Sequence, residues 1–377
     1  MKDRLLSIDV MRGMTIFFMI IVNTPGTWTY VYAPLRHAKW HGCTPTDLVF
    51  PFFLFIVGVS MAISLHKFVT QTLVESGASS KLIFKILRRS LLIFLVGLFL
   101  NWFPFYHKNI GDLRILGVLQ RIALAYCGAG ILVVLLKDKM KIAVTTVILL
   151  FGYWALMAFS GTDDPYSLEG NLATWFDPLI LGESHVYGGF GIPFDPEGLI
   201  STIPGIAHVL IGYFIGLILL RIHQKGAVQL SYTGACIHLM ITGVVLTILS
   251  LIWNAGFPIN KPIWTSSYVL LSCGLGTILL AGLMWIIDIK KWVKWTYVFR
   301  VFGLNPLVSY ALSGLFVKLM ITTFKWDETN AYAWFYQTIF QPIFGNFAGS
   351  FAFALTYTMF IWFFAWLLFR KGKIIKL

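Results

Sequence analysis

The sequence predicts an all-α, polytopic integral membrane protein. Hydrophobic residues make up 58% of the 377 residues and charged residues only 12%, which is about half of the charged share usual in soluble domains. The mean hydropathy is +0.79. A soluble protein of this composition would lack the polar side chains to cover its surface. The apolar residues also lie in long continuous runs, which predict helices rather than the alternating strands of a membrane barrel.

Ten apolar runs are long enough to cross the hydrocarbon core, which takes about 20 residues in a helix. In chain order they cover residues 8–24, 46–66, 84–103, 112–136, 141–160, 199–221, 229–253, 264–287, 298–320 and 342–369. The first run has no small-residue cleavage site after it, so we expect it to remain as a span. Residues 1–377 are expected to form one transmembrane domain.

The placement of Lys and Arg indicates the orientation of these spans. With the N-terminus in the cytoplasm, 20 of the 29 Lys and Arg residues fall in cytoplasmic segments and five in external ones. We therefore expect both termini in the cytoplasm. The net charge of +13 is then mainly a topology signal, so no nucleic-acid partner is expected. The five external cations are Arg36, Lys39, Lys108, Lys261 and Lys325.

Two long external loops are expected, at about residues 24–46 and 161–198. The first contains RHAKWHG at positions 36–42, with four titratable side chains in seven residues. The second is rich in acids and aromatic residues and has no Lys or Arg. Its apolar stretch NLATWFDPLILG predicts order. Aromatic rings stack on sugar faces and carboxylates bind hydroxyl and ammonium groups, so this loop suits an amino sugar.

Charged residues inside the predicted spans are costly and often functional. Asp9 and Arg12 are three apart and can pair on one helix face, as a structural salt bridge or in a functional role. Arg114 and Arg121 are seven apart, so both are expected on one face of a helix over 112–136, with Gln120 alongside. Snorkelling explains Arg114. Arg121 is deeper and indicates either a bound anion or an internal ion pair.

These segments resemble the membrane domain of the heparan-α-glucosaminide N-acetyltransferase family and its bacterial NagX-type relatives. The segment LRHAKWHGCTPTDLVFPFFLFIVGVSM is similar to the family pattern HAxWxG–DLVFPxFxFxxG. Further matches follow in the family's order: SIDVMRG, LRILGVLQRIALAY, FDPEGLISTIPGI, NKPIWTSSYVL and GLNPLVSY. The soluble domain that precedes the first span of the animal enzyme has no counterpart here, so we expect a multi-pass protein of a bacterial inner membrane.

The resemblance implies a transmembrane N-acetyltransferase. Acetyl would pass from cytoplasmic acetyl-CoA to the amine of glucosamine, or of a terminal glucosaminide, on the periplasmic side. The family implies a homodimer in the bilayer and no metal. It implies catalytic roles for His37, at the HAxW position, and for Asn23.

Further roles follow from the matching motif positions. The other motif positions match Asp47, Arg114, Gln120, Arg121, Asp195, Glu197, Asn260 and Asn305. We expect substrate contacts at Asp47, His41, Asp195, Glu197, Asn260 and Trp264. We expect contacts with acetyl-CoA at Arg12, Arg114, Gln120, Arg121 and Asn305. His41 stands where the animal enzyme has asparagine, so its role is open.

The chemistry of these residue types suits acetyl transfer. A neutral imidazole at His37 can take a proton from the attacking amine, or can itself attack the thioester and carry the acetyl group. The amide of Asn23 can stabilise the oxyanion. Asp47 either caps the second span or orients a histidine. Asp195, before Pro196, is expected to cap the span over 199–221, and Glu197 to face substrate.

Two other functions fit parts of the sequence. An amino-sugar transporter would also need spans and intramembrane charges, but its site is expected near the bilayer midplane, often within repeated halves. No such repeat is evident, and the densest reactive cluster, RHAKWHG, is expected at the external interface. A structural or regulatory membrane protein would leave the buried charges unexplained. The sequence therefore favours the acetyltransferase.

Overall fold

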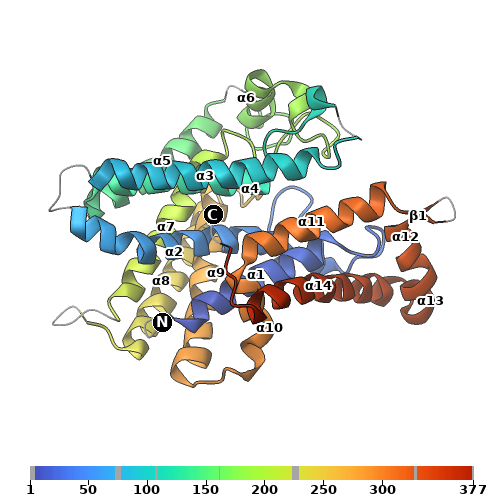
Figure 1. Ribbon diagram of the computed structural model, residues 1–377. Helices are drawn as coiled ribbons and strands as arrows, with labels where there is room; N and C mark the ends of the chain where they lie inside the picture. The colour runs from blue at the N-terminus through green and yellow to red at the C-terminus, as the bar shows by residue number, and fades with distance from the viewer. Residues whose placement is uncertain are drawn as a thin grey trace.

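The computed structural model describes residues 5–72, 78–106, 109–160, 162–222, 229–326 and 329–375. Several residues that entered the predictions lie outside these ranges: Lys2, Arg4, Lys108, Gly161, Lys225 and Lys376. The described chain is almost entirely helical (Figure 1). The predicted all-α membrane fold is confirmed.

The longer helices are α1 (Leu6–Asn23), α2 (Val49–Thr72), α3 (Ala78–Trp102), α4 (Val118–Leu136), α5 (Lys139–Ala158), α7 (Thr202–Leu220), α8 (Tyr232–Trp253), α9 (Ser266–Leu283), α11 (Pro306–Thr322) and α14 (Asn346–Arg370). Shorter helices are α6 (Leu172–Leu181), α10 (Tyr297–Leu304), α12 (Ala331–Phe335) and α13 (Gln341–Phe344). Single turns are η1 (Ala33–Leu35), η2 (Pro45–Leu48), η3 (Ile110–Asp112), η4 (Glu183–His185) and η6 (Lys294–Thr296), and wider π-turns are η5 (Met284–Ile289) and η7 (Tyr336–Phe340). Strands β1 (Lys325–Trp326) and β2 (Thr329–Asn330) pair antiparallel.

Each of the ten predicted spans falls on a helix or a helix pair. Within the described ranges, eight helices are long and apolar enough to cross a membrane, or nine if α10 and α11 together form one span. The helix over 84–103 is α3, which does not meet that test; its first half is strongly basic, with Lys85, Arg88 and Arg89. The number of spans and the side of each terminus therefore stay predictions.

The predicted span over 298–320 is not continuous, which corrects the sequence interpretation. Helices α10 and α11 meet at an angle of 77°. The break lies at Asn305, whose φ of −128° and ψ of 55° are not helical. The residue before a proline is disfavoured in the α conformation, and Pro306 then begins the next helix.

Helices pack closely where glycines face a neighbouring backbone. Helix α2 lies along α7 and α1 along α10. A Cβ on Gly58 of α2 would lie 2.1 Å from the carbonyl oxygen of Val209 on α7. A Cβ on Gly303 of α10 would lie 2.1 Å from the carbonyl oxygen of Asp9 on α1. Both crossings therefore depend on the missing side chain, as in other membrane helix pairs.

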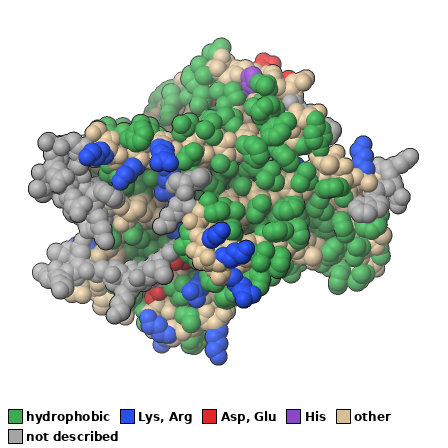
Figure 2. All heavy atoms as spheres, in the orientation of Figure 1, with side chains coloured by type: hydrophobic (Ala, Val, Ile, Leu, Met, Phe, Trp, Pro, Cys, Tyr) green, Lys and Arg blue, Asp and Glu red, His purple; other side chains and the backbone are tan. Residues whose placement is uncertain are grey.

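Apolar side chains cover much of the face seen in Figure 2, over the helices that Figure 1 shows as α3, α4, α11 and α14. Most of the Lys and Arg side chains on this face lie toward its left and lower edges, near the start of α3 and near α10. The acids and the histidine at the top lie over the α6 region. This separation agrees in kind with the charge asymmetry found in the sequence.

Candidate active site

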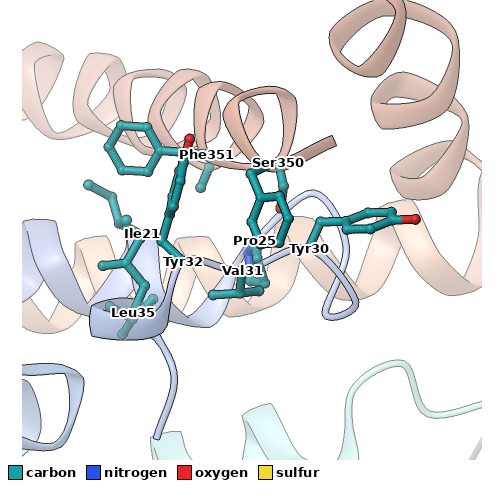
Figure 3. Close-up of a pocket in the computed structure, with 11 residues that line it drawn as sticks. Ile21, Pro25, Tyr30, Val31, Tyr32, Leu35, Ser350 and Phe351 are labelled. Atoms are coloured by element: carbon teal, nitrogen blue, oxygen red, sulfur yellow. The ribbon is translucent and has the colours of Figure 1, made fainter. Parts of the chain in front are cut away.

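The loop over residues 24–46, which the sequence predicts to be external, is held against α14 before it reaches RHAKWHG. Figure 3 shows Tyr32 beside Phe351, and their ring centroids are 6.4 Å apart. Arg36 turns back into the loop, where its Nε donates to the carbonyl oxygen of Val31 at 2.8 Å. The loop therefore has a fixed path where it delivers His37.

His37 and Asp47 form a close side-chain pair in the first of two charged clusters. His37 Nδ1 lies 2.6 Å from Asp47 Oδ1, and the side chains are 44% and 2% exposed. A carboxylate only accepts hydrogen bonds, so the proton of a neutral imidazole belongs on Nδ1. The lone pair is then on Nε2 of a half-exposed ring. This arrangement leaves one nitrogen of His37 free to act as a base or a nucleophile.

Asp47 is fixed through both of its carboxylate oxygens. Its Oδ2 accepts from the backbone N–H of Ala38 and of Thr44, and from Thr44 Oγ1, each at 3.0 Å. Its backbone carbonyl accepts from the hydroxyl of Tyr268 on α9. The sequence left capping and histidine orientation as alternatives for Asp47. The structure shows both contacts, because each oxygen serves one of them.

Lys261 is the third member of the cluster, and sequence reasoning counted it only as an external cation. Its Nζ lies 3.1 Å from His37 Nδ1 and 3.4 Å from Asp47 Oδ1, and its side chain is 18% exposed. Burial lowers the pKa of Lys261 from its ordinary value of 10.5, and the charge of Asp47 raises it. A sequence signal existed, because Lys261 follows Asn260 directly in the motif NKPIWTSSYVL.

The loop that carries Lys261 also meets the second histidine. Asn260 Nδ2 lies 3.4 Å from His41 Nδ1, and the backbone N–H of Gly42 donates to the carbonyl oxygen of Ile259 at 2.7 Å. Asn260 is fully buried, and its Oδ1 accepts from the backbone N–H of Ile263 at 3.0 Å. The structure thus brings together four of the residues selected from the sequence: His37, His41, Asp47 and Asn260.

A second charged cluster joins the segment before α4 to the second external loop. Arg114 binds Asp195 through two bonds, Nε to Oδ2 at 2.8 Å and Nη2 to Oδ1 at 2.6 Å. Its Nη2 also lies 2.6 Å from Glu197 Oε2, and its guanidinium lies 4.7 Å from the ring centre of Tyr187. Asp195 is fully buried and Glu197 is 12% exposed. The positive charge of Arg114 is therefore matched by two carboxylates.

This cluster corrects two helix boundaries expected from the sequence. Helix α4 begins at Val118, so Arg114 does not share a helix face with Arg121. The segment is extended because Asn101 Nδ2 donates to the carbonyls of Arg114 and Leu116 at 2.9 and 3.1 Å. Asp195 does not cap α7 either.

The cap of α7 is Ser201, and residues 195–198 form a turn before it. In that turn the carboxylate of Asp195 accepts from the N–H of Glu197 at 2.9 Å and of Tyr187 at 3.2 Å. Asp195 therefore fixes loop backbone rather than the start of a helix.

Arg121 lies behind the two clusters, fully buried. Its Nη2 donates to Ser201 Oγ at 2.5 Å and to the carbonyl oxygens of Pro196 and Gly198. Its guanidinium lies 5.1 Å from the ring centre of Trp264. Within the described residues its Nε and Nη1 have no hydrogen-bond partner. Of the two alternatives left by the sequence, the described residues show carbonyl, hydroxyl and ring contacts in place of an internal ion pair, and a bound anion stays a prediction.

Trp264 and Gln120 are also buried, with exposures of 1% each. Trp264 packs against Phe50 and Tyr268, with ring centroids 5.2 and 5.3 Å apart. A Cβ on Gly97 of α3 would lie 2.4 Å from the side-chain oxygen of Gln120 on α4. Both side chains lie in the packed interior that supports the site.

The two external loops pack on each other, as an ordered second loop requires. Trp40 Nε1 donates to the carbonyl oxygen of Tyr166 at 2.7 Å, and its ring lies 5.6 Å from that of Phe194. The apolar stretch of the loop forms α6, which confirms the predicted order. Asp177 of α6 is fully buried and accepts from the N–H of Leu199 at 3.1 Å, and burial raises its pKa to about 6.

Three residues selected from the sequence lie apart from these contacts. Asn23 is exposed at the end of α1, and its Nδ2 donates to the carbonyl of Met19 at 2.8 Å. Arg12 pairs with Asp9 at 3.2 Å, which confirms that they share a face, and its Nη2 donates to Ser60 Oγ on α2.

Asn305, at the α10–α11 break, binds the C-terminal segment: Nδ2 donates to the carbonyl of Lys373 at 3.0 Å, and Oδ1 accepts from the N–H of Ile375 at 2.8 Å. Among the described side chains, no three His, Cys, Asp or Glu residues gather as a metal site. The expectation of no metal stays a prediction.

The fold and the site define a multi-pass membrane protein with a histidine–carboxylate pair where two loops meet the start of α9. The family model described as heparan-alpha-glucosaminide N-acetyltransferase, catalytic, matches residues 4–248. This covers well over half of the chain, so the chain belongs to that family. Asn260, Lys261, Trp264 and Asn305 lie beyond the matched residues.

Two curated relatives show the same similarity. The chain is 27% identical over 367 residues to the heparan-alpha-glucosaminide N-acetyltransferase of Homo sapiens, which covers 82% of this chain and 52% of the relative. It is 28% identical over 366 residues to the enzyme of the same name from Mus musculus, covering 82% and 53%. The chain therefore spans about half the length of the curated relatives that it matches.

Proposed function

We propose that this protein is a transmembrane N-acetyltransferase. It moves acetyl from acetyl-CoA on the cytoplasmic side to the amine of glucosamine, or of a terminal glucosaminide, on the opposite side. Family membership and the names of the two relatives support this reaction. The observation that carries the proposal is the contact of His37 with Asp47, which frees Nε2 on a half-exposed ring.

In the direct route, the amine nitrogen attacks the carbonyl carbon of the thioester. The new N–C bond forms, the C–S bond breaks, and Nε2 of His37 takes the proton that the amine loses. The imidazolium then returns this proton to the departing thiolate, so the products are the N-acetyl sugar and CoA. Asp47 keeps Nδ1 protonated throughout, which holds the ring in the tautomer that this step needs.

In the two-step route, Nε2 of His37 attacks the thioester and CoA leaves as the thiolate. The acetyl group is then bonded to the imidazole. The amine attacks the acetyl carbon, the bond to Nε2 breaks, and the proton from the amine neutralises the thiolate. Both routes use the same tautomer, and both need a donor for the oxyanion. We assign that role to the exposed amide of Asn23, which needs a movement of its side chain or of the substrate to act there.

The acceptor amine is proposed to bind between the two external loops. Glu197 uses one carboxylate oxygen on Arg114 and can offer the other to an ammonium or hydroxyl group. Asn260 contacts His41, and the loop that carries His41 packs on the second loop through Trp40 and Phe194. Asp195 and Trp264 support these groups from buried positions.

The donor is proposed to reach His37 from the basic end of the helices. Arg12, Arg114, Gln120, Arg121 and Asn305 remain the residues proposed for acetyl-CoA. A cavity of about 290 Å³ lies between α1, α2 and α9, and its lining includes Met11 and Val22. These two residues are 11 positions apart on α1, about 16 Å along a helix. Leu35 and Thr46, which lie next to the site segments in the chain, also line it.

We also propose that the protein is a homodimer in a bacterial inner membrane, as the family resemblance implies. Cross-linking in intact inner membranes, followed by mass measurement of the purified species, tests this. A protein that cross-links and elutes only as a monomer would contradict the dimer without affecting the proposed chemistry.

The activity is tested with purified protein in bilayer vesicles, incubated with acetyl-CoA and glucosamine. Equal amounts of free CoA and N-acetylglucosamine are expected, and His37→Ala should abolish both. Vesicles loaded on one side only with each substrate test the sidedness. Uptake of labelled glucosamine without acetylation would refute the proposal in favour of an amino-sugar transporter.

A further inference from the structure

The side-chain nitrogen of Lys261 lies beside Nδ1 of His37, the ring nitrogen that faces Asp47. Its Nζ is nearer to His37 Nδ1, at 3.1 Å, than to Asp47 Oδ1, at 3.4 Å. The 2.6 Å contact between Nδ1 and Oδ1 requires a proton on Nδ1, so the ammonium of Lys261 has no lone pair to bind there. Lys261 therefore lies against His37 as a charge, and its own favourable partner is Asp47.

The charges of the cluster balance only while His37 is neutral. Asp47 contributes one negative charge, and its Oδ2 is already occupied by three donors. As an ammonium, Lys261 cancels this charge; burial lowers its pKa, and the negative charges of Asp47 and Glu197 oppose that shift. An imidazolium would add an unmatched positive charge about 3 Å from an ammonium, in a place where Asp47 is 2% exposed and solvent screens poorly.

The other titratable groups near the cluster are neutral, exposed or bound to other partners. The negative charge of Glu197 raises the pKa of Lys261. Cys43 is a neutral thiol, because burial raises its pKa to about 12. Arg36 is turned into its own loop, and Lys39 is exposed. His41 contacts Asn260 rather than His37. The balance at His37 is therefore set mainly by Asp47 and Lys261.

We infer that Lys261 is an electrostatic positioning residue, which keeps His37 neutral with its lone pair on Nε2 by opposing protonation of the ring. This inference deepens the proposed function and rests on it for its biological meaning. In the direct route, Lys261 makes the imidazolium return its proton readily to the thiolate. In the two-step route, it destabilises the positively charged acetyl-imidazole and favours transfer of acetyl to the amine.

The first test measures the protonation of His37 without any substrate. Diethyl pyrocarbonate acylates neutral imidazole, so the rate of labelling at His37, followed by mass spectrometry of its peptide, reports the neutral fraction at each pH. The purified full-length chain is compared with Lys261→Gln, which keeps a donor for Asp47 but loses the charge, and with Lys261→Arg, which keeps both. Lys39→Gln is the matched control, because it removes an exposed lysine two residues from His37.

Removing the charge of Lys261 makes His37 easier to protonate. In Lys261→Gln the midpoint of the labelling profile is therefore expected to move to higher pH by about one unit, the lower end of the effect of a neighbouring charge. Lys261→Arg and Lys39→Gln are expected to keep the original midpoint. An unchanged midpoint in Lys261→Gln, or an equal shift in Lys39→Gln, would overturn the inference. A thermal unfolding scan of each variant excludes samples that have not folded.

The second test uses turnover. The low-pH limb of kcat/KM for acetyl transfer is expected to move by the same amount in Lys261→Gln, and Lys261→Arg is expected to restore it. A uniform fall in rate, with the same pH profile, would show a merely structural role and reject the inference. If no acetyl transfer occurs at any pH, the proposed function fails, while the labelling profile still decides the role of Lys261.

Discussion

The two charged clusters of the site use similar residue types in opposite ways. In the Arg114 cluster one guanidinium satisfies two carboxylates, and its main partner, Asp195, is fully buried. In the His37 cluster one carboxylate is shared by two nitrogens, and the imidazole that it orients is 44% exposed. In the first cluster the buried pair of Arg114 and Asp195 holds two segments together. The second leaves Nε2 unused, so it can react.

The difference shows that burial decides whether a charged cluster supports the fold or is available to react. A buried ion pair with complete hydrogen bonding resists any change, because each partner would be left uncompensated. A histidine at the edge of the protein, held by a buried carboxylate, keeps a fixed ring and an accessible lone pair.

Replacing His37 by Ala is expected to abolish acetyl transfer, a loss of at least about 1,000-fold, because both routes pass through Nε2. The thermal unfolding midpoint should move little, since the ring is half exposed and Lys261 remains on Asp47. The measurements are the rate of CoA release and a thermal scan. His238→Ala, at an exposed position of α8, is the matched control. Near-normal turnover in His37→Ala would show that the His37 cluster is not the reactive one.

Replacing Arg114 by Met is expected to reduce the free energy of unfolding by about 3–5 kcal/mol, because Asp195 becomes a buried charge without its partner. Denaturant unfolding in detergent micelles measures this change. The double variant Arg114→Met, Asp195→Asn should recover part of the loss. A single variant as stable as the parent would mean that the cluster is not structural.

Asp177 is expected to make the second loop's stability depend on pH. Burial raises the pKa of this carboxyl from 3.8 to about 6 in the folded protein. Between about pH 4 and 6 the folded state then binds more protons than the unfolded state, so the free energy of unfolding falls as the pH rises. The total change is about 3 kcal/mol, and it is complete above the folded pKa.

Asp177→Asn keeps the acceptor for the N–H groups of Leu199 and Ile200 and removes the titration. Its unfolding midpoint should therefore vary less between pH 4 and 7 than that of the parent, as measured by thermal scans at several pH values. Parallel pH profiles for the two proteins would contradict the assignment.

Replacing Glu197 by Gln is expected to have the smallest effect. Arg114 keeps its two bonds to Asp195, so stability should change little. The KM for glucosamine should rise about two- to fivefold, the usual worth of one partly exposed ion pair, while the KM for acetyl-CoA stays the same. Steady-state kinetics with each substrate varied in turn measures both. An effect on acetyl-CoA alone would place Glu197 on the donor side.

Much of the architecture could be predicted because the bilayer imposes it. Long apolar runs must become helices when no water is available to the backbone, and all ten predicted runs fall on helices. The errors lie where local backbone chemistry overrides the apolar pattern. Pro306 breaks one run at Asn305, and Asn101 holds the segment before α4 extended by binding its carbonyls.

For the candidate site, the sequence alone determined which residue types are present and which short segments are reactive. It identified RHAKWHG, Asp47 ten positions after His37, and the acidic second loop. Only the tertiary structure decided the partners. Lys261 reaches His37 across 224 positions of the chain, and Arg114 reaches Asp195 across 81. Helix packing brings such distant residues together. Sequence periodicity fixes which face of a helix is apolar, but not which loop lies beside that helix.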